Sequence, residues 1–150
     1  MPFTPYHLGI ALLIGVIFHK KIDIPSILAG SIVLDIWPYL VLMYNLPYPL
    51  HWISHSFLVA FIVGIILAFL RLKINIIKCN YTFPILLLSS VLGTFSHVIL
   101  DTPLYNDILP FWPLAINPFL GLYSYEASVQ FSIFCFVAAF VVIVIKRKQL

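Results

Sequence analysis

The sequence predicts an all-α integral membrane protein with about five transmembrane helices and a Pro-rich interfacial flap before the last of them. Of the 150 residues, 63% are hydrophobic and 9% are charged, and the mean hydropathy is +1.11. Soluble globular domains carry about 25% charged residues, so this composition excludes that class. At about 20 residues per span, residues 1–150 can form a single multi-span domain.

Five hydrophobic segments follow one another along the chain, at residues 4–19, 25–44, 49–70, 83–102 and 126–145. In the first, Thr4 is suited to be the N-cap and Pro5 the first helical residue. That segment is short for a span and needs local thinning of the bilayer or burial by its neighbours. Pro38 should kink or break the second segment just beyond Asp35. Pro103 ends the fourth segment.

Residues 103–125 are apolar but too rich in proline for a long helix. They contain Pro103, Pro110, Pro113 and Pro118 with Phe111, Trp112, Phe119 and Tyr123. Irregular backbone at membrane depth is tolerated only where protein or a water-filled cavity covers it. We therefore expect an interfacial or re-entrant flap.

The basic residues predict the orientation in the membrane. All eight fall between the first and second segments, between the third and fourth, or after the fifth, as Lys20, Lys21, Arg71, Lys73, Lys78, Lys146, Arg147 and Lys148. The positive-inside rule makes that side cytoplasmic, with the N-terminus outside and the C-terminus inside the cell membrane. The net charge of +3 forms no basic stripe, so no nucleic-acid partner is expected. We expect neither a disulfide nor a metal-ligand role for Cys79 and Cys135.

Six residues with metal-binding side chains lie on four of these segments, and the predicted topology places them together in the outer half of the membrane. They are His7, Asp35, His51, His55, His97 and Asp101. An ionisable side chain within lipid is costly and usually functional. The pairs His51/His55 and His97/Asp101 are each separated by four residues, so on a helix both members leave the same face.

Charge strengthens the case for a metal ion. Asp35 and Asp101 have no Lys or Arg on their side of the membrane, and a buried carboxylate must be neutralised or must find a cation. A divalent cation would compensate; the alternative is that both acids are protonated and bonded to Ser31, Ser54, Ser56, Thr94 or Ser96. Imidazole and carboxylate ligands suit Zn first, with Mn, Fe or Ni also possible. Six candidate ligands exceed the four positions around one tetrahedral ion. Either two ions bind, or some of the six residues orient the ligands or act as bases.

Glu126 begins the fifth segment on the outer side and is a candidate general base, with Asp35 as a second candidate. An acid in a first helical turn also complements the helix dipole, and that structural role remains an alternative for Glu126. Asp107 lies in the expected flap, where a turn or surface role is favoured over catalysis, and it follows Asp35 as a base to test. His19 lies on the cytoplasmic side and is excluded from the site.

Four motifs resemble those of the YdjM-type membrane-bound metal-dependent hydrolases. They are MPFTPYHLG at residues 1–9, DIWP at 35–38, YPLHWISHS at 48–56 and HVILDTPLY at 97–105. The resemblance runs from residue 1 to about residue 122 and implies a small multi-span hydrolase. Many relatives carry a second acidic residue where this chain has Trp37, so one ligand is missing. The order of His and Asp residues is also similar to that of zinc-dependent phospholipase C, as an analogy only.

The sequence and the resemblance together favour a metal-dependent hydrolase that acts on a lipid or lipid-linked ester or phosphoester at the outer leaflet. No Lys or Arg lies on the outer side to hold a phosphate, so an ester or amide bond stays open. One alternative is a metal-ion or proton transporter or channel. Another is a non-catalytic membrane protein that a metal staples together. Substrate, metal and oligomeric state are left open by the sequence.

Overall fold

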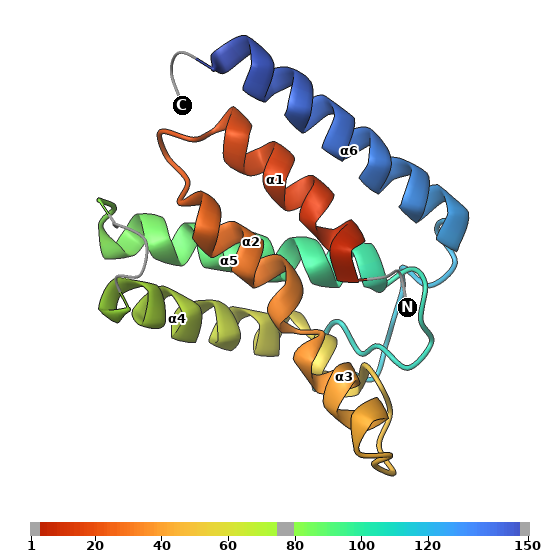
Figure 1. Cartoon of the computed structure of the whole chain (residues 1–150). Coiled ribbons are helices and arrows are strands. Elements are labelled where there is room, and N and C mark those ends of the chain that lie inside the picture. Colours follow the sequence, from red (N-terminus) through yellow and green to blue (C-terminus); the bar gives the residue numbers. More distant parts are fainter. Residues whose placement is uncertain (1–3, 75–79, 148–150) are drawn as a thin grey trace.

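The computed structural model describes residues 4–74 and 80–147, and these residues form helices and turns without a strand (Figure 1). Lys78, Cys79 and Lys148 lie outside the described residues. In chain order the elements are the 3-10 helix η1 (Thr4–Tyr6), α1 (His7–Ile17), α2 (Ile24–Val33), α3 (Ile36–Met43), the 3-10 helix η2 (Trp52–His55), α4 (Phe57–Lys73), α5 (Phe83–Asp101) and α6 (Tyr125–Lys146).

Three helical stretches are long and apolar enough to cross a membrane: Ile24–Met43, Phe83–Asp101 and Tyr125–Lys146. The helix α1 is apolar but shorter, with 11 residues. The helix α4 has 17 residues and is also apolar along most of its length. The length and composition of these helices define a helical membrane protein.

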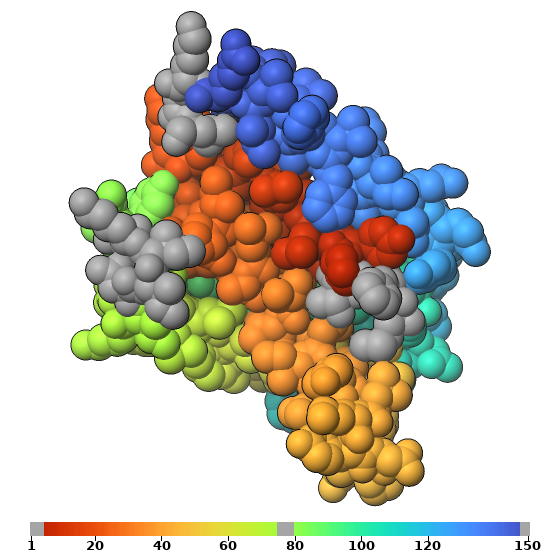
Figure 2. Space-filling view, in the orientation of Figure 1, coloured from red at the N-terminus to blue at the C-terminus, as the bar shows by residue number. Residues whose placement is uncertain are grey.

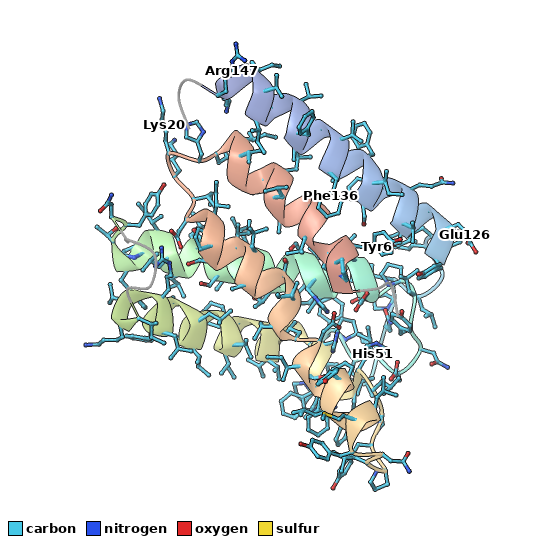
Figure 3. All side chains as sticks on the ribbon, in the orientation of Figure 1. Tyr6, Lys20, His51, Glu126, Phe136 and Arg147 are labelled. Atoms are coloured by element: carbon cyan, nitrogen blue, oxygen red, sulfur yellow. The ribbon has the colours of Figure 1, made fainter. Side chains whose placement is uncertain are left out.

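The helix α5 is the centre of the bundle, since α2 and α4 both pack against it. On the other side of α2 lies α1, and α6 packs on α1 (Figure 1). Lys20 and Arg147 lie toward one end of this bundle, whereas Tyr6, His51 and Glu126 lie toward the other (Figure 3). We call the first of these the basic end and the second the site end.

Asp23 fixes the start of α2 at the basic end. Its carboxylate accepts hydrogen bonds from the Ser26 amide at 3.1 Å and from the Ser26 hydroxyl, which is the pattern of an N-cap. Arg71 of α4 donates to the same carboxylate at 3.0 and 3.3 Å. The Asp23 amide donates to Ser89 of α5 at 2.9 Å. One residue thereby ties the start of α2 to two neighbouring helices.

The second hydrophobic segment breaks at Leu34 and Asp35, between α2 and α3. We expected the break just beyond Asp35, and it falls one residue earlier. The cause is still Pro38, which has no N–H to donate to the Leu34 carbonyl and whose ring crowds that carbonyl. Beyond the break, α3 leaves the bundle and forms a protruding lobe (Figures 1 and 2). Ile36 and Leu42 on this lobe are more than half exposed.

The third segment is not one helix from residue 49, as we expected. Its helix α4 begins at Phe57, because Ser56 has extended backbone and its hydroxyl accepts a hydrogen bond from the Val59 amide at 3.2 Å. His51 and His55 therefore lie before α4, around the short helix η2. The prediction that they occupy one face of an α-helix was wrong.

Residues 102–124, which follow α5, form turns and no helix. Asn117 donates to the carbonyls of Thr102 and Tyr105 at 2.9 and 3.3 Å, and the Tyr123 hydroxyl donates to the Leu100 carbonyl at 2.8 Å. The Phe57 amide donates to the Pro110 carbonyl. These bonds hold the irregular segment against the site end of α4 and α5.

Candidate metal centre

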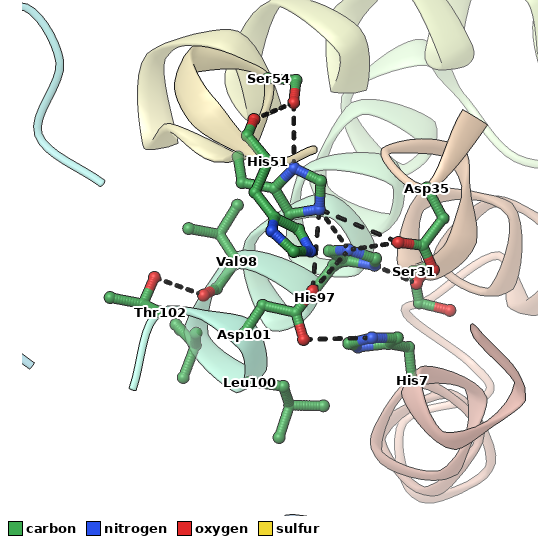
Figure 4. Close-up of polar contacts among 12 residues, drawn as sticks. His7, Ser31, Asp35, His51, Ser54, His97, Val98, Leu100, Asp101 and Thr102 are labelled. Atoms are coloured by element: carbon green, nitrogen blue, oxygen red, sulfur yellow. Dashed lines mark hydrogen bonds and ion pairs between the residues drawn. The ribbon is translucent and has the colours of Figure 1, made fainter. Parts of the chain in front are cut away.

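Four buried side chains at the site end bring their ligand atoms within 4.8 Å of one another, as Asp35, His55, His97 and Asp101 (Figure 4). The four residues come from three different parts of the chain. Asp35 lies in the break after α2, His55 ends η2, and His97 and Asp101 lie one turn apart on α5. Sequence segments that are far apart along the chain therefore meet at one point.

The spacing of these atoms fits a single ion. The Nε2 atoms of His55 and His97 are 3.1 Å apart. Asp101 Oδ2 lies 3.4 Å from His97 Nε2 and 3.7 Å from His55 Nε2. Asp35 Oδ1 lies 3.5 and 3.9 Å from the same two nitrogens. With bonds of about 2.0–2.1 Å, the ligands of a tetrahedral zinc lie about 3.4 Å apart.

The hydrogen bonds of the two imidazoles leave both Nε2 atoms as acceptors. His97 Nδ1 donates to the Ser31 carbonyl at 2.7 Å. The single hydroxyl proton of Ser54 is donated to the His51 carbonyl, so at 3.0 Å His55 Nδ1 must be the donor to Ser54 Oγ. Such partners are the usual way in which proteins fix the tautomer of a metal-binding histidine. The donor set, its charge and its tautomers fit a divalent cation.

Close packing of α2 on α5 places the Ser31 carbonyl at His97. A Cβ added to Gly30 would lie 2.6 Å from the Ser90 carbonyl oxygen, and one added to Gly93 would collide with the Ile27 carbonyl oxygen. Only glycine permits backbones to approach this closely, as in other membrane helix pairs. Gly30 directly precedes Ser31, and Gly93 lies one turn before His97, so the contact positions the site.

His7 and His51, the other two predicted ligands, lie beside the four-residue set. The His7 ring stacks on the His97 ring at 3.9 Å between centroids, and its Nε2 is 3.4 Å from Asp101 Oδ1. The His51 ring meets the His55 ring edge-on at 4.9 Å. All six predicted residues are thus brought together, with four arranged to share one ion.

Asp107 holds His51 in place. The carboxylate accepts hydrogen bonds from the His51 amide at 3.1 Å and from His51 Nδ1 at 3.0 Å. Partial burial raises the pKa of Asp107, but the hydrogen bond from the His51 amide and the contact with its ring outweigh burial and hold that pKa below its usual value. Asp107 is therefore a carboxylate at neutral pH, and His51 Nδ1 carries the proton.

Tyr105 covers the other face of His51, with ring centroids 4.1 Å apart. Its hydroxyl is buried and makes no hydrogen bond to a described residue. Burial, and secondly the charge of Asp101, raise the pKa of Tyr105 well above its usual value. The phenol is therefore a hydrogen-bond donor at neutral pH.

Glu126, the predicted base, lies apart from this cluster. It is in the first turn of α6, fully exposed, and points away from the bundle (Figure 3). Ser124 caps that helix by accepting from the Ala127 amide at 3.3 Å. This position matches the alternative expectation, in which an acid complements the helix dipole.

Sequence reasoning assigned no site role to Tyr105 and favoured a turn or surface role for Asp107 over a catalytic one. The two residues are four and six positions beyond Asp101, in the segment that we predicted to be a flap. A carboxylate in an otherwise apolar loop was the available signal for Asp107. Nothing in the sequence paired it with His51, because the two residues are 56 positions apart.

The fold and this centre define a class: a helical membrane protein that holds two imidazoles and two carboxylates in a metal-binding arrangement among its helices. The chain belongs to the YdjM inner membrane protein family, which it matches over residues 1–150. This confirms the resemblance drawn from the four sequence motifs. No curated protein and no solved structure matches the chain.

Proposed function

We propose that this protein is a membrane-embedded, metal-dependent hydrolase of a lipid or lipid-linked ester or phosphoester. In this proposal five helices span the membrane, the basic end is cytoplasmic, and residues 103–125 form a flap over the outer side of the centre. Asp35, His55, His97 and Asp101 hold the ion, zinc being the first candidate. When bound, the ion supplies a Lewis acid that polarises the scissile group and acidifies water toward a pKa of about 7.

The observation that carries this proposal is a set of buried polar atoms around the four ligands that make no hydrogen bond to a described residue. They are Nδ1 of His7, Nε2 of His51 and the hydroxyl of Tyr105, whereas His7 Nε2 and Asp101 Oδ1 face each other at 3.4 Å. A buried polar group without a partner costs roughly 1–3 kcal/mol. A metal that only staples helices needs no such surroundings, whereas a polar substrate and water would satisfy them.

The helix lengths support a centre in the outer half of the membrane. The helices α1 and α2 have 11 and 10 residues, or about 15–17 Å at 1.5 Å per residue. Both run from the basic end to the centre, because α1 begins at His7 and α2 ends just before Asp35. This is about half of a hydrocarbon core of roughly 30 Å. The helices α4 and α5 have 17 and 19 residues, or about 26–29 Å, and the centre lies where α4 begins and α5 ends. The centre is therefore beyond the midpoint of the core, and lipid is a natural neighbour of the site.

Two apolar cavities at the site end of the bundle have room for lipid chains. One of about 390 Å³ lies among Ile10, Leu100, Phe131 and their neighbours, and another of about 310 Å³ lies among Phe57, Thr102, Phe119 and theirs. Ile99 and Tyr123 line both. Leu100 and Thr102 flank Asp101 in the chain, so both cavities lie at the site end of α5. These cavities support a lipid as the substrate class.

The chain offers distinct groups for binding and proton transfer. The Asp107 carboxylate orients His51 through Nδ1–H, and His51 Nε2 is left able to accept a proton from water. The Tyr105 hydroxyl can donate to an oxygen that gains negative charge during hydrolysis. Asp35 and Glu126 remain the bases proposed from sequence, of which Asp35 is at the centre.

A transporter is less well supported than a hydrolase. One transit path, from the centre to the basic end along the interface of α2 and α5, is closed. Gly30 and Gly93 bring those two backbones into direct contact there, and this leaves no room for a hydrated ion.

The test combines metal analysis with a screen of lipid substrates. We expect purified protein to carry one divalent ion per chain and to hydrolyse a lipid ester or phosphoester in a metal-dependent manner. The variant Tyr105→Phe keeps the metal in this proposal but loses turnover, since it removes only the hydroxyl. A metal-loaded protein that hydrolyses no member of a broad lipid panel, and whose Tyr105→Phe variant behaves like wild type, would favour the staple.

A further inference from the structure

A second concave site lies at the basic end, about one helix length from the metal centre. A cavity of about 230 Å³ is lined by Ile17, Phe18, His19, Lys20, Lys21 and Lys146. It forms where α1 ends, the chain turns toward α2, and the last turn of α6 packs alongside. The turn is fixed by hydrogen bonds from the Lys21 amide to the Phe18 carbonyl and from the Tyr81 hydroxyl to the His19 carbonyl.

The cavity has a net positive charge. Three of its six lining residues are lysines and none is acidic. The acid that follows in the chain, Asp23, is engaged by Arg71 and Ser26. It therefore does not neutralise Lys20 or Lys21.

Some hydrogen-bond donors of the residues that line the cavity are already engaged, and others are available to a ligand. The Lys146 ammonium donates to the Ile17 carbonyl at 2.8 Å and to the Val16 carbonyl at 3.5 Å. An ammonium has three N–H donors, so one remains for a ligand. Lys20 and Lys21 are exposed at the rim. His19 Nε2 is buried and makes no hydrogen bond to a described residue, so it can pair with a hydroxyl or amine of that ligand.

The apolar surroundings identify the kind of ligand. Ile17 and Phe18 are 40% and 54% exposed directly beside the lysines, at the point where two apolar helices end. A soluble anion needs no such apolar rim, whereas a phospholipid places its phosphate and its acyl chains at this junction. Basic pockets between membrane helices are the usual setting for anionic headgroups.

We propose that this cavity binds the headgroup of an anionic phospholipid, with Lys20, Lys21 and Lys146 on the phosphate and His19 Nε2 on a headgroup hydroxyl. Phosphatidylglycerol has both groups. Because the cavity lies at the opposite end from the metal centre, this binding is independent of the proposed hydrolysis.

The experiment measures lipid retention by native mass spectrometry of the full chain in detergent, with phosphatidylglycerol and phosphatidylcholine as probes. We expect wild type to retain phosphatidylglycerol preferentially. A lysine at an anionic lipid surface contributes about fivefold in affinity, so the triple variant Lys20→Gln/Lys21→Gln/Lys146→Gln should lose about a hundredfold. The triple Lys→Arg variant, which keeps all three charges, should retain binding.

Two further measurements make the result decisive. Lys73→Gln removes an exposed charge of α4 outside the cavity and should leave retention unchanged; an equal loss there would mean a general charge effect and would overturn the proposal. Inorganic phosphate that binds as tightly as phosphatidylglycerol would overturn the lipid assignment. If the triple variant does not fold, Lys20→Gln/Lys21→Gln changes only exposed residues, and wild-type retention in that variant would refute the site.

Discussion

The Nε2 atoms of His55 and His97 face each other at 3.1 Å, and when both rings are neutral neither atom carries the proton that would make this a hydrogen bond. The proton of each ring is on Nδ1, where Ser54 and the Ser31 carbonyl accept it. Two lone pairs at this distance repel unless a cation lies between them. The carboxylates of Asp35 and Asp101 lie beside the same two nitrogens. Their two negative charges favour a divalent cation.

Removing one ligand should therefore remove the ion. We expect His97→Ala and Asp101→Ala each to lower the metal content measured by elemental analysis of purified protein. His19→Ala should leave that content unchanged, because His19 lies at the basic end. Full metal occupancy in His97→Ala would show that the centre is elsewhere.

Chelation should destabilise the protein without unfolding it. A ligand that binds only the folded state contributes about 2.7 kcal/mol when its concentration is 100 times its Kd. We expect the Tm of the chelated protein to fall and to recover when the metal is returned. The same treatment of Asp101→Ala is the control and should change nothing. An unchanged Tm in wild type would argue against a tightly bound ion.

Tight packing at Gly93 should be needed for metal binding. Gly93→Ala would force its Cβ against the Ile27 carbonyl, and overpacking of this kind costs about 1–3 kcal/mol. We expect a lower Tm and a lower metal content, because α2 carries the Ser31 carbonyl that orients His97. In Gly15→Ala the new Cβ would lie 3.2 Å from a methylene carbon of the Ile24 side chain, which can move. That variant should retain its metal, and equal effects of the two substitutions would contradict the argument.

The proposed orientation can be tested by labelling. A reporter fused after residue 150 should be cytoplasmic, and a tag inserted between residues 105 and 118 should react with an impermeant reagent in intact cells. The reason is that Lys20, Arg71, Lys73 and Arg147 all belong to the basic end. A tag that reacts only after permeabilisation would place the flap and the metal centre on the inner side.

The proton acceptor can be identified by comparing two matched substitutions. Asp107→Asn should keep metal but lower turnover by on the order of 10²–10⁴-fold, the usual contribution of general base catalysis, because an amide no longer fixes the tautomer of His51. Glu126→Gln should leave turnover intact, since that side chain is exposed at the start of α6. The reverse result would restore Glu126 as the base and leave Asp107 a structural role.

Much of the fold could be predicted from the sequence because membrane helices are recognised by their length and hydrophobicity. Residues 83–102 and 126–145 were expected as helices, and α5 and α6 begin and end within one residue of those bounds. The start of α4 was missed, although four of the eight residues from Pro49 to Ser56 are His or Ser. The Ser56 cap decides the boundary there, whereas the four-residue spacing of His51 and His55 favoured a longer helix.

The candidate site was predictable in composition but not in geometry. Burial cost alone singled out His7, Asp35, His51, His55, His97 and Asp101. That four of them share one point depends on the close packing of α2 on α5 and on the turn that carries His55. Long-range pairings such as His51 with Asp107 arise from tertiary structure, so the spacing of residues along the chain does not predict them.

The two ends of α2 have a consequence for how the protein meets its metal. At its start, Asp23 is bonded to Arg71 of α4 and to Ser89 of α5; at its other end, the Ser31 carbonyl accepts from His97. Because both ends of α2 are bonded to neighbouring helices, we expect the helix to keep its place when the centre is empty. Metal uptake would then need no assembly of the protein in the bilayer. The same folded chain could then gain and lose its ion repeatedly. Occupancy of the metal centre would depend on the supply of ions more than on synthesis of new chain.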